Sequence, residues 1–406
     1  MATVAAQSNL TGDRSATWGE FTARAAAIAP VIREHADEGA QLRRLPDASW
    51  REFVRTGLYR AMQPARWGGG EAHPRELYHA VREVARADGS AGWVLGVLGV
   101  HPWQAALFPR EFQEEFWGAD PAAINSSSYA ATGKAEKSPG GYRLSGRWSF
   151  STGCDHCQWV VLGAVPGTVS INGRDLPELR SFMLPRKDYR IDDNWFVAGM
   201  AGTGSKDIVV DGAFVPEHRT QSHWDYTFNR PLPGWELNPG AIYRLPFAVV
   251  FNYTLTAAVL GAAQGFLDQW IDISRTRRAG YGGAVKDDPL SQHLAAEARY
   301  TIDAGIALLD ADCAELMDAA RRGDPLPLAD RARIRHHACR SAQSAMMAVD
   351  RLFAASSGRA IFIGHPLQRR YFDLKGMLGH AYLNPDPPAL SFGAFAFGNE
   401  VRDMML

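Results

Sequence analysis

A short run from Gly146 to Val165 gathers side chains that could do chemistry. It reads GRWSFSTGCDHCQWVVLGAV, and Cys154 and Cys157 form a C-x-x-C motif around His156. A structural zinc site needs four ligands, usually as two pairs, and the other cysteines lie far along the chain in helical patterns. A redox-active pair opens a helix after a strand, whereas this pair separates two expected strands. We interpret both cysteines as buried, structural residues and expect no metal site.

Hydroxyl side chains precede the cysteines at the end of an expected strand. Ser149, Ser151 and Thr152 follow the aromatic residues Trp148 and Phe150. Alternation along a strand predicts that Trp148, Phe150 and Thr152 share one face. An aromatic face that ends in a hydroxyl suits the border of a flat heterocycle. A half-buried strand that enters a turn has the same pattern, so the residues alone leave both interpretations open.

Three zones of the chain must position these residues. Residues 1–121 have a helical pattern with an expected break at Asp88. Residues 122–235 are richer in glycine, proline and β-branched residues, which indicates a compact β domain of short strands, a sandwich or barrel. Residues 236–406 contain long helices that predict an antiparallel four-helix bundle, followed by a tail expected to be irregular from Asn384. The predicted fold class is α+β, mostly α.

Charge and composition exclude several classes of protein. The formal net charge is −1 over 406 residues, and charges of both signs are interspersed, which argues against a nucleic-acid surface. The uncharged run from Leu245 is long enough for a membrane span. It contains proline and polar residues and stands alone, so we interpret it as a core helix. The N-terminus lacks the pattern of a secretory signal, and we expect a cytoplasmic protein without a membrane partner.

Several motifs in the order of the chain resemble one enzyme group. They are PARWGGGEAHP (Pro64–Pro74), DGSAGWVLGVLGVHPWQAALF (Asp88–Phe108), the segments Ser126–Ala164 and Val197–Arg219, and in the bundle Lys286–Ala298, Asp350–Phe362 and Pro366–Asp386. The chain is similar to the flavin-dependent two-component monooxygenases of the acyl-CoA dehydrogenase fold. That group includes the 4-hydroxyphenylacetate, hydroxylated secosteroid, dibenzothiophene and indole oxygenases.

The resemblance implies an activity and its partners. An aromatic substrate, such as a phenol, an indole or a polycycle, would be hydroxylated through a flavin hydroperoxide, with reduced flavin (FADH2 or FMNH2) as cofactor and dioxygen as co-substrate. No G-x-G-x-x-G follows an expected strand, so the chain shows no nicotinamide site of its own. A separate NAD(P)H:flavin reductase would supply the reduced flavin. By family analogy the chain would form a homotetramer.

Other activities on the same fold remain as alternatives. Acyl-CoA dehydrogenation needs a carboxylate base, which in many dehydrogenases follows an R-Y-R-D segment. Here RRYFDLKGMLGHAYLN aligns with that segment and offers His380, with no carboxylate. The missing glutamate disfavours a dehydrogenase, while oxidation of nitrogen or sulfur would use the same flavin chemistry. A non-catalytic or thiol-based protein is the alternative from another class.

The resemblance also assigns residues to the substrate. It places a histidine and a tryptophan on the substrate side, where this chain has His101 and Trp103. From the residues alone, His101 is equally a loop histidine before a helix that begins at Pro102. Ser128 is either a strand hydroxyl or, by resemblance, a contact of the flavin or the substrate hydroxyl, and His380 is either a helix-end cap or a histidine near both. The candidate catalytic residues are therefore His101, Ser128, Thr152 and His380, and the candidate substrate contacts are His101, Trp103, Ser128 and His380.

The flavin is expected in a slot between the β domain and the bundle. Thr152, or Ser151, would hold the proton of a flavin nitrogen, His380 would assist the hydroperoxide, and Trp103, Trp148 and Phe150 would form apolar walls. In this fold an arginine at the end of a bundle helix reaches flavin phosphate, often that of a neighbouring subunit. Three arginines at a helix end are otherwise a solvated terminus. The expected cofactor contacts are Ser126, Ser128, Trp148, Phe150, Ser151, Thr152, Arg275, Arg277 and Ser357.

Overall fold

The computed structural model describes residues 19–399 except 172 and 281, and the start and end of the chain lie outside this part. The first zone is helical. Its helices are α1 (Glu20–Glu34), α2 (Ala36–Leu42), α3 (Asp47–Thr56), α4 (Pro74–Ala87), α5 (Gly89–Ala105) and α6 (Arg110–Trp117). The expected break at Asp88 is confirmed, because this residue caps α5 and its carboxylate accepts a hydrogen bond from Ala91 N at 2.9 Å.

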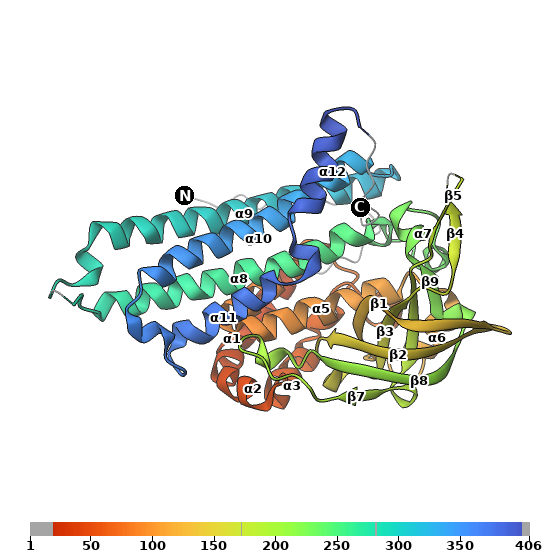
Figure 1. Ribbon diagram of the computed structural model, residues 1–406, viewed down its shortest axis with the longest axis horizontal. Coiled ribbons are helices and arrows are strands. Elements are labelled where there is room, and N and C mark those ends of the chain that lie inside the picture. Colours follow the sequence, from red (N-terminus) through yellow and green to blue (C-terminus); the bar gives the residue numbers. More distant parts are fainter. Residues whose placement is uncertain (1–18, 172, 281, 400–406) are drawn as a thin grey trace.

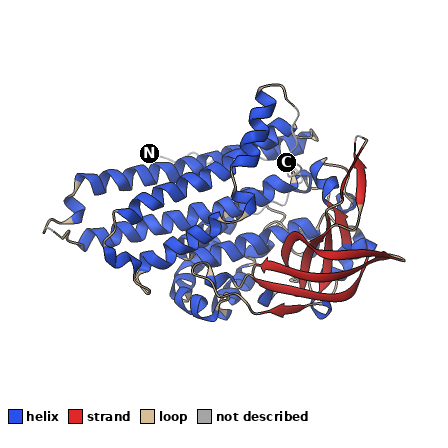
Figure 2. Cartoon of the chain, viewed as in Figure 1, coloured by secondary structure: helices blue, strands red, loops and turns tan. Residues whose placement is uncertain are grey.

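Strands follow the helices and form one large sheet (Figure 2). Its seven strands lie in the order β7-β8-β2-β1-β3-β6-β9, and β1 and β3 are parallel whereas the other pairs are antiparallel. Two further strands pair as a separate hairpin. The bounds are β1 (Asn125–Ser138), β2 (Gly141–Ser151), β3 (Trp159–Ala164), β4 (Thr168–Ile171), β5 (Arg174–Pro177), β6 (Arg180–Pro185), β7 (Arg190–Asp192), β8 (Lys206–Pro216) and β9 (Thr220–Ser222).

The bundle lies beside the sheet and forms the long axis of the molecule (Figure 1). After the short helix α7 (His223–Thr227) it contains α8 (Phe247–Thr276), α9 (Pro289–Arg322), α10 (Leu328–Ala354) and α11 (Pro366–Leu378). The apolar window of α8 is 100% buried, so the uncharged run is a core helix as predicted. The expectation of an irregular tail is wrong, because Asp386–Ala396 forms the helix α12. Proline residues in its first turn are compatible with a helix start.

The direction of α8 decides which residues can meet. Figure 1 shows that its first residues lie beside the β domain and that its last residues lie at the opposite end of the molecule. A helix of 30 residues spans about 45 Å. Side chains near Thr276 are therefore remote from the sheet within one chain.

Candidate active site

Helix α5 is the element that gathers the candidate site. All of its residues except Val97 are buried, because one side packs on α4 and α8 and the C-terminal part meets β1. His101 lies inside this helix, so the interpretation as a loop histidine before a new helix is wrong. Pro102 is accommodated within the helix, where it removes one backbone hydrogen bond without ending it.

The end of strand β2 departs from the predicted alternation. Trp148 is 0% exposed and packs in the core of the β domain, where its indole N–H donates to Gly163 O at 2.7 Å. Phe150 is 70% exposed and has φ of +66°, a conformation that is strained for a bulky side chain. The pairing of β2 with β8 shifts register between Trp148 and Ser151. Trp148 and Phe150 therefore do not share a face, and Trp148 lies in a core rather than on an open wall.

Two serine hydroxyls form hydrogen bonds between β1 and β2. Ser151 Oγ donates to Ser126 Oγ at 2.9 Å, and both side chains are 0% exposed. Ser128 Oγ donates to Ser149 O at 2.8 Å, and Ser128 is 7% exposed. The proton of Ser128 is thus used, and its oxygen remains able to accept a hydrogen bond.

Thr152 belongs to a longer chain of hydroxyls. Its Oγ1 lies 2.8 Å from Ser205 Oγ, which in turn lies 2.7 Å from Thr203 Oγ1. Thr203 Oγ1 donates to Met200 O at 2.9 Å. Thr203 and Ser205 were not among the predicted site residues, although both stand in the glycine-rich motif GMAGTGS within the segment Val197–Arg219.

His101 is buried without hydrogen-bond partners. The residue is 0% exposed, and neither ring nitrogen has a partner among residues 19–399 as far as they are described. Its ring lies 6.4 Å from the ring of Tyr129 and 5.8 Å from that of Phe251, measured between centroids. Burial lowers the pKa of His101 to about 3, so the imidazole is neutral near pH 7. A neutral imidazole has one donor and one acceptor, and both lack a protein partner here.

His380 lies where α11 ends. Its Nδ1 accepts a hydrogen bond from Tyr382 N at 3.2 Å, so the helix-end cap predicted from the residues is present. The side chain is exposed, yet the protein around it lowers its pKa to about 4. We interpret this combination as a ring with one part open to solvent and another part packed against protein. Because Nδ1 accepts, the neutral ring carries its proton on Nε2 and presents a donor.

Contacts along α5 bring the candidates together. The His380 ring lies 5.7 Å from Trp93, and a β-carbon at Gly153, next to Thr152, would lie 3.0 Å from Leu98 Cδ1. Residues 93, 98 and 101 follow one another within about 12 Å of helix axis. Helix α5 therefore contacts the surroundings of His380 through Trp93 and those of Thr152 through Leu98, and it contains His101 itself.

Other predicted residues lie elsewhere. Trp103 is 0% exposed and donates to Ile242 O at 2.7 Å, so it supports the core behind His101. Arg275 and Arg277 lie at the far end of α8, where Arg277 Nη2 donates to Ala355 O at 3.0 Å beside Ser357. Within one chain the structure does not bring these cofactor candidates to the hydroxyls of β2.

The cysteine motif has the properties of a structural pair. Cys154 Sγ donates to Gly204 O and Cys157 Sγ to Gly153 O, and both residues are buried. Burial raises the pKa of the Cys154 thiol to about 12, which disfavours the thiolate that redox or metal chemistry requires. The His156 ring stacks on Trp50 at 4.8 Å between centroids, and its Nε2 lies 3.0 Å from Leu45 O.

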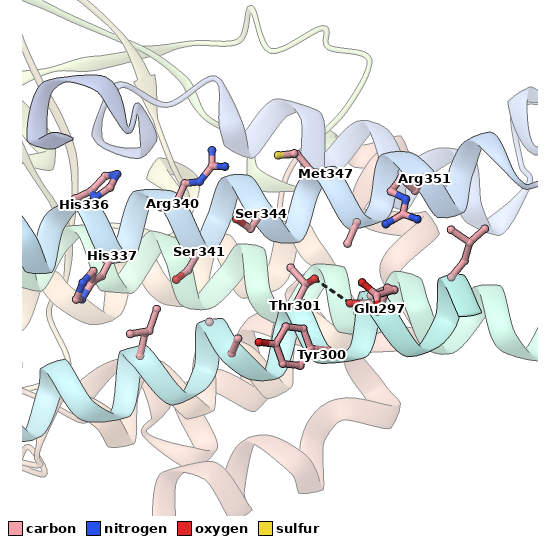
Figure 3. A pocket seen from close by; sticks show the side chains of 16 residues that line it. Glu297, Tyr300, Thr301, His336, His337, Arg340, Ser341, Ser344, Met347 and Arg351 are labelled. Carbon is pink, nitrogen blue, oxygen red and sulfur yellow. Dashed lines mark hydrogen bonds between the residues drawn. The ribbon is translucent and has the colours of Figure 1, made fainter. Parts of the chain in front are cut away.

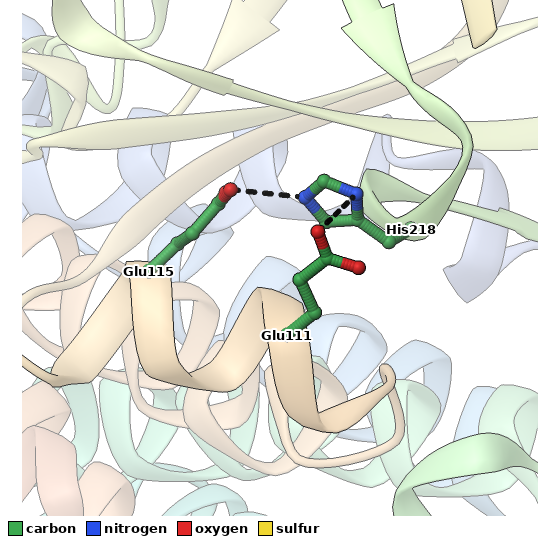
Figure 4. A group of neighbouring side chains, drawn as sticks. All are labelled: Glu111, Glu115 and His218. Carbon is green, nitrogen blue, oxygen red and sulfur yellow. Dashed lines mark hydrogen bonds and ion pairs between the residues drawn. The ribbon is translucent and has the colours of Figure 1, made fainter. Parts of the chain in front are cut away.

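A cluster of charged side chains and a groove lie away from α5. Figure 4 shows His218 between Glu111 and Glu115, where His218 Nε2 lies 3.0 Å from Glu115 Oε1. Arg219 also binds Glu115, at 2.6 Å, so this cluster is already a charge-paired surface contact. A groove of about 450 Å³ lies between α9 and α10. Figure 3 shows the labelled side chains of both helices along it.

Comparison with known proteins identifies the family of the chain. The family model "Acyl-CoA dehydrogenase, N-terminal domain" matches residues 20–118, and "Acyl-CoA dehydrogenase, C-terminal domain" matches residues 253–385. The chain is 39% identical to the flavin-dependent monooxygenase oxygenase subunit HsaA of Rhodococcus jostii strain RHA1, over 94% of this chain and 99% of that protein. It is 31% identical to the oxygenase component of an FADH2-dependent resorcinol hydroxylase of Rhizobium, over 93% and 94%.

Solved structures show the same relation. The crystal structure of 3-HSA hydroxylase from Rhodococcus sp. RHA1 superposes with a TM-score of 0.89 at 38% identity, covering 95% of this chain and 99% of that one. XiaF from Streptomyces, in complex with FADH2 and glycerol, superposes with a TM-score of 0.85 at 27% identity, covering 95% and 96%. The chain therefore belongs to the oxygenase components of the flavin-dependent monooxygenases that are built on the acyl-CoA dehydrogenase fold.

Proposed function

We propose that this oxygenase component hydroxylates an aromatic substrate that is held against His101. The observation that carries the proposal is the buried imidazole of His101, which lacks partners for both ring nitrogens within the described residues. An unpaired buried polar group costs about 1–3 kcal/mol, and a bound ligand with a hydroxyl or ring N–H would recover part of it. The aromatic rings of Tyr129 and Phe251 beside it suit a planar substrate.

Ser128 complements His101 in this proposal. Its proton is used by Ser149 O, so its oxygen can accept the proton of a phenol. A phenol that donates to Ser128 or His101 gains electron density on its ring, which favours attack by the ring on an electrophilic oxygen. The names of the relatives give a phenolic or indolic substrate as the class to test first.

The residues around Thr152 fit reduced flavin. When bound, the reduced flavin would activate dioxygen and supply one oxygen atom to the substrate. Thr152 is 5% exposed whereas Ser151 is fully buried and donates to Ser126, so Thr152 is the better candidate for the flavin nitrogen. The exposed, strained Phe150 would cover the ring and exclude water, and His380 would donate from Nε2.

The partner and the setting follow from the same proposal. Reduced flavin would come from a separate NAD(P)H:flavin reductase, and the protein would act in the cytoplasm with no need of membrane or nucleic acid. The groove between α9 and α10 carries exposed apolar side chains, among them Tyr300 at 72% and Met347 at 54%, which would pack against further copies in a homotetramer. Such an assembly would also bring Arg275 or Arg277 of one copy toward the flavin phosphate of another.

Oxidation without oxygen transfer is the competing function. The segment after α11 offers His380 where an acyl-CoA dehydrogenase of this pattern carries a carboxylate base.

The experiment that tests the proposed function mixes Thr152→Ala and the unchanged protein with reduced flavin, dioxygen and a panel of phenols and indoles. We expect the unchanged protein to couple oxygen uptake to hydroxylated product and Thr152→Ala to release hydrogen peroxide instead. Equal coupling in the two proteins would remove Thr152 from the site.

A further inference from the structure

The hydroxyl chain from Met200 to Thr152 has only one favourable direction. Met200 O is a carbonyl and can only accept, so the proton of Thr203 Oγ1 must point to it across 2.9 Å. The reverse direction would leave two oxygens at 2.9 Å without a proton between them, which is repulsive. Thr203 Oγ1 can then only accept from Ser205 Oγ at 2.7 Å, and Ser205 Oγ can only accept from Thr152 Oγ1 at 2.8 Å.

The proton of Thr152 is thereby committed to Ser205. All three hydroxyl side chains are buried, at 5% exposure or less, so water does not compete for these protons. The described part of the chain gives Thr152 Oγ1 no other partner. What Thr152 presents to a bound ring is therefore a lone pair, a hydrogen-bond acceptor.

The loop that carries the chain is held rigidly. Met200 has φ of +60°, and its carbonyl also accepts from Thr203 N at 3.0 Å and from Trp195 Nε1 at 3.1 Å. Met200 N donates to the buried carboxylate of Asp373 on α11 at 2.5 Å. A side chain at Gly199 would meet Phe372 O at 2.1 Å, so the loop lies directly on the backbone of α11. The direction of the hydroxyl chain is thus fixed by the fold before any ligand binds.

We propose that Ser205 and Thr203 are positioning residues that make the oxygenase select reduced over oxidised flavin. The inference rests on the proposed contact between Thr152 and the central-ring nitrogen N5 of the flavin. In oxidised flavin N5 bears a lone pair, which an acceptor repels, whereas in reduced flavin N5 bears a proton, which an acceptor binds. A hydroxyl free to rotate would serve both forms equally.

Binding measurements test the inference without turnover. The affinities of oxidised FAD and of dithionite-reduced FAD are measured under argon by equilibrium titration. We expect the unchanged protein to prefer reduced FAD, and Ser205→Ala to lower this preference about threefold to tenfold, the factor of one hydrogen bond. The loss should come from tighter binding of oxidised FAD, because the freed Thr152 proton can turn toward N5. A merely structural defect would weaken both forms.

Matched variants distinguish the loss of a hydroxyl group from a change in side-chain volume. Thr203→Val should act like Ser205→Ala, and Thr203→Ser should restore the preference. Thr256→Val is the control, because Thr256 is a fully buried threonine in α8 whose hydroxyl also donates to a carbonyl, Ala338 O at 3.1 Å. That variant should keep the preference of the unchanged protein.

Double variants distinguish a failure of this inference from a failure of the proposed contact between Thr152 and flavin. In a Thr152→Val background, Ser205→Ala should have no further effect on the preference. If Thr152→Val changes the preference and Ser205→Ala does not, the inference is overturned and the contact of Thr152 with flavin stands. If Thr152→Val leaves the preference unchanged, the proposed contact itself is wrong and the inference falls with it.

Discussion

The two ends of the candidate site differ in how their polar groups are satisfied. Near Thr152, the hydroxyls of Thr152, Ser205 and Thr203 all have hydrogen-bond partners within the fold. Near His101 both nitrogens of a buried imidazole lack one among the described residues. The first arrangement is complete and fixes its direction beforehand, whereas the second gains hydrogen bonds only when a ligand arrives. Under the proposed function, the first arrangement suits a constant cofactor and the second suits a substrate that supplies the missing hydrogen bonds.

The largest effect is expected at His101. His101→Phe should lower kcat/KM at least about 100-fold, because the group that orients the substrate is lost. The free energy of unfolding should stay equal or rise by about 1–3 kcal/mol, since an unpaired buried polar group disappears. Steady-state hydroxylation and urea unfolding measure the two quantities.

His223 provides the matched control for that variant. It is a half-buried histidine whose pKa is also lowered by burial, to about 4, but its Nε2 lies 2.8 Å from Ser181 Oγ. His223→Phe should therefore destabilise the protein by leaving Ser181 without its partner. A His101→Phe protein that is as destabilised as His223→Phe would show that the imidazole of His101 is paired in solution.

The next effect is expected at Asp373, whose carboxylate accepts a hydrogen bond from Met200 N and so anchors the loop beside Thr152. Burial and the nearby Asp88 raise the pKa of Asp373 to about 7. Asp373→Ala should lower the free energy of unfolding by about 1–3 kcal/mol, because Met200 N loses its acceptor. Asp373→Asn keeps an acceptor oxygen and should restore most of the stability and the preference for reduced flavin. Equal losses in both variants would mean that the charge, and not the hydrogen bond, holds the loop.

A further effect concerns the dependence of stability on acid pH. Burial holds the pKa of His101 at about 3 and that of His223 at about 4, below the usual 6.5. The unfolded chain therefore binds more protons than the folded protein from pH 6.5 down to about 4, and stability should fall in this window by up to about 1.4 kcal/mol per pH unit for each histidine. The raised pKa of Asp373 opposes the fall by one proton.

The contribution of His101 can be isolated by difference. His101→Phe removes a fully buried histidine whose pKa is lowered, so its unfolding free energy should depend less steeply on pH between 6.5 and 4. Urea unfolding at several pH values measures both slopes. An identical slope in His101→Phe would show that the imidazole is protonated at the same pH in the folded and unfolded states.

The smallest effect on stability is expected at the far end of the bundle. Arg275 pairs with Asp272 at 2.7 Å, and both side chains are mostly exposed, at 69% and 62%. Arg275→Ala should change the free energy of unfolding by less than about 1 kcal/mol. Its affinity for FAD should fall if the arginine serves a neighbouring copy. Arg299→Ala, which breaks a similar exposed pair with Asp303, is the control and should leave the affinity unchanged.

Local patterns in the sequence predicted the elements well. The strands of the β domain lie within residues 122–235 and the bundle helices within residues 236–406, as periodicity and composition indicated. The break at Asp88 was also predicted, and in the structure its carboxylate caps α5. The resemblance supplied the proposed role of the hydroxyl motif, which the residues alone left open.

Long-range geometry could not be predicted. The left-handed backbone at Phe150 breaks the strand alternation, and phenylalanine gives no sign of it. Pro102 suggested a helix start, but the surrounding core keeps it inside α5. The partner of Thr152 lies 53 residues away along the chain, so no local pattern reveals that its proton is already used.

A crystal structure with reduced flavin and a phenolic substrate tests the central claim most directly. We predict a flavin nitrogen at about 3 Å from Thr152 Oγ1, and the phenol oxygen within hydrogen-bond distance of His101 or Ser128. A tricyclic ring bound elsewhere, such as in the groove between α9 and α10, with His101 still unpaired, would contradict the account.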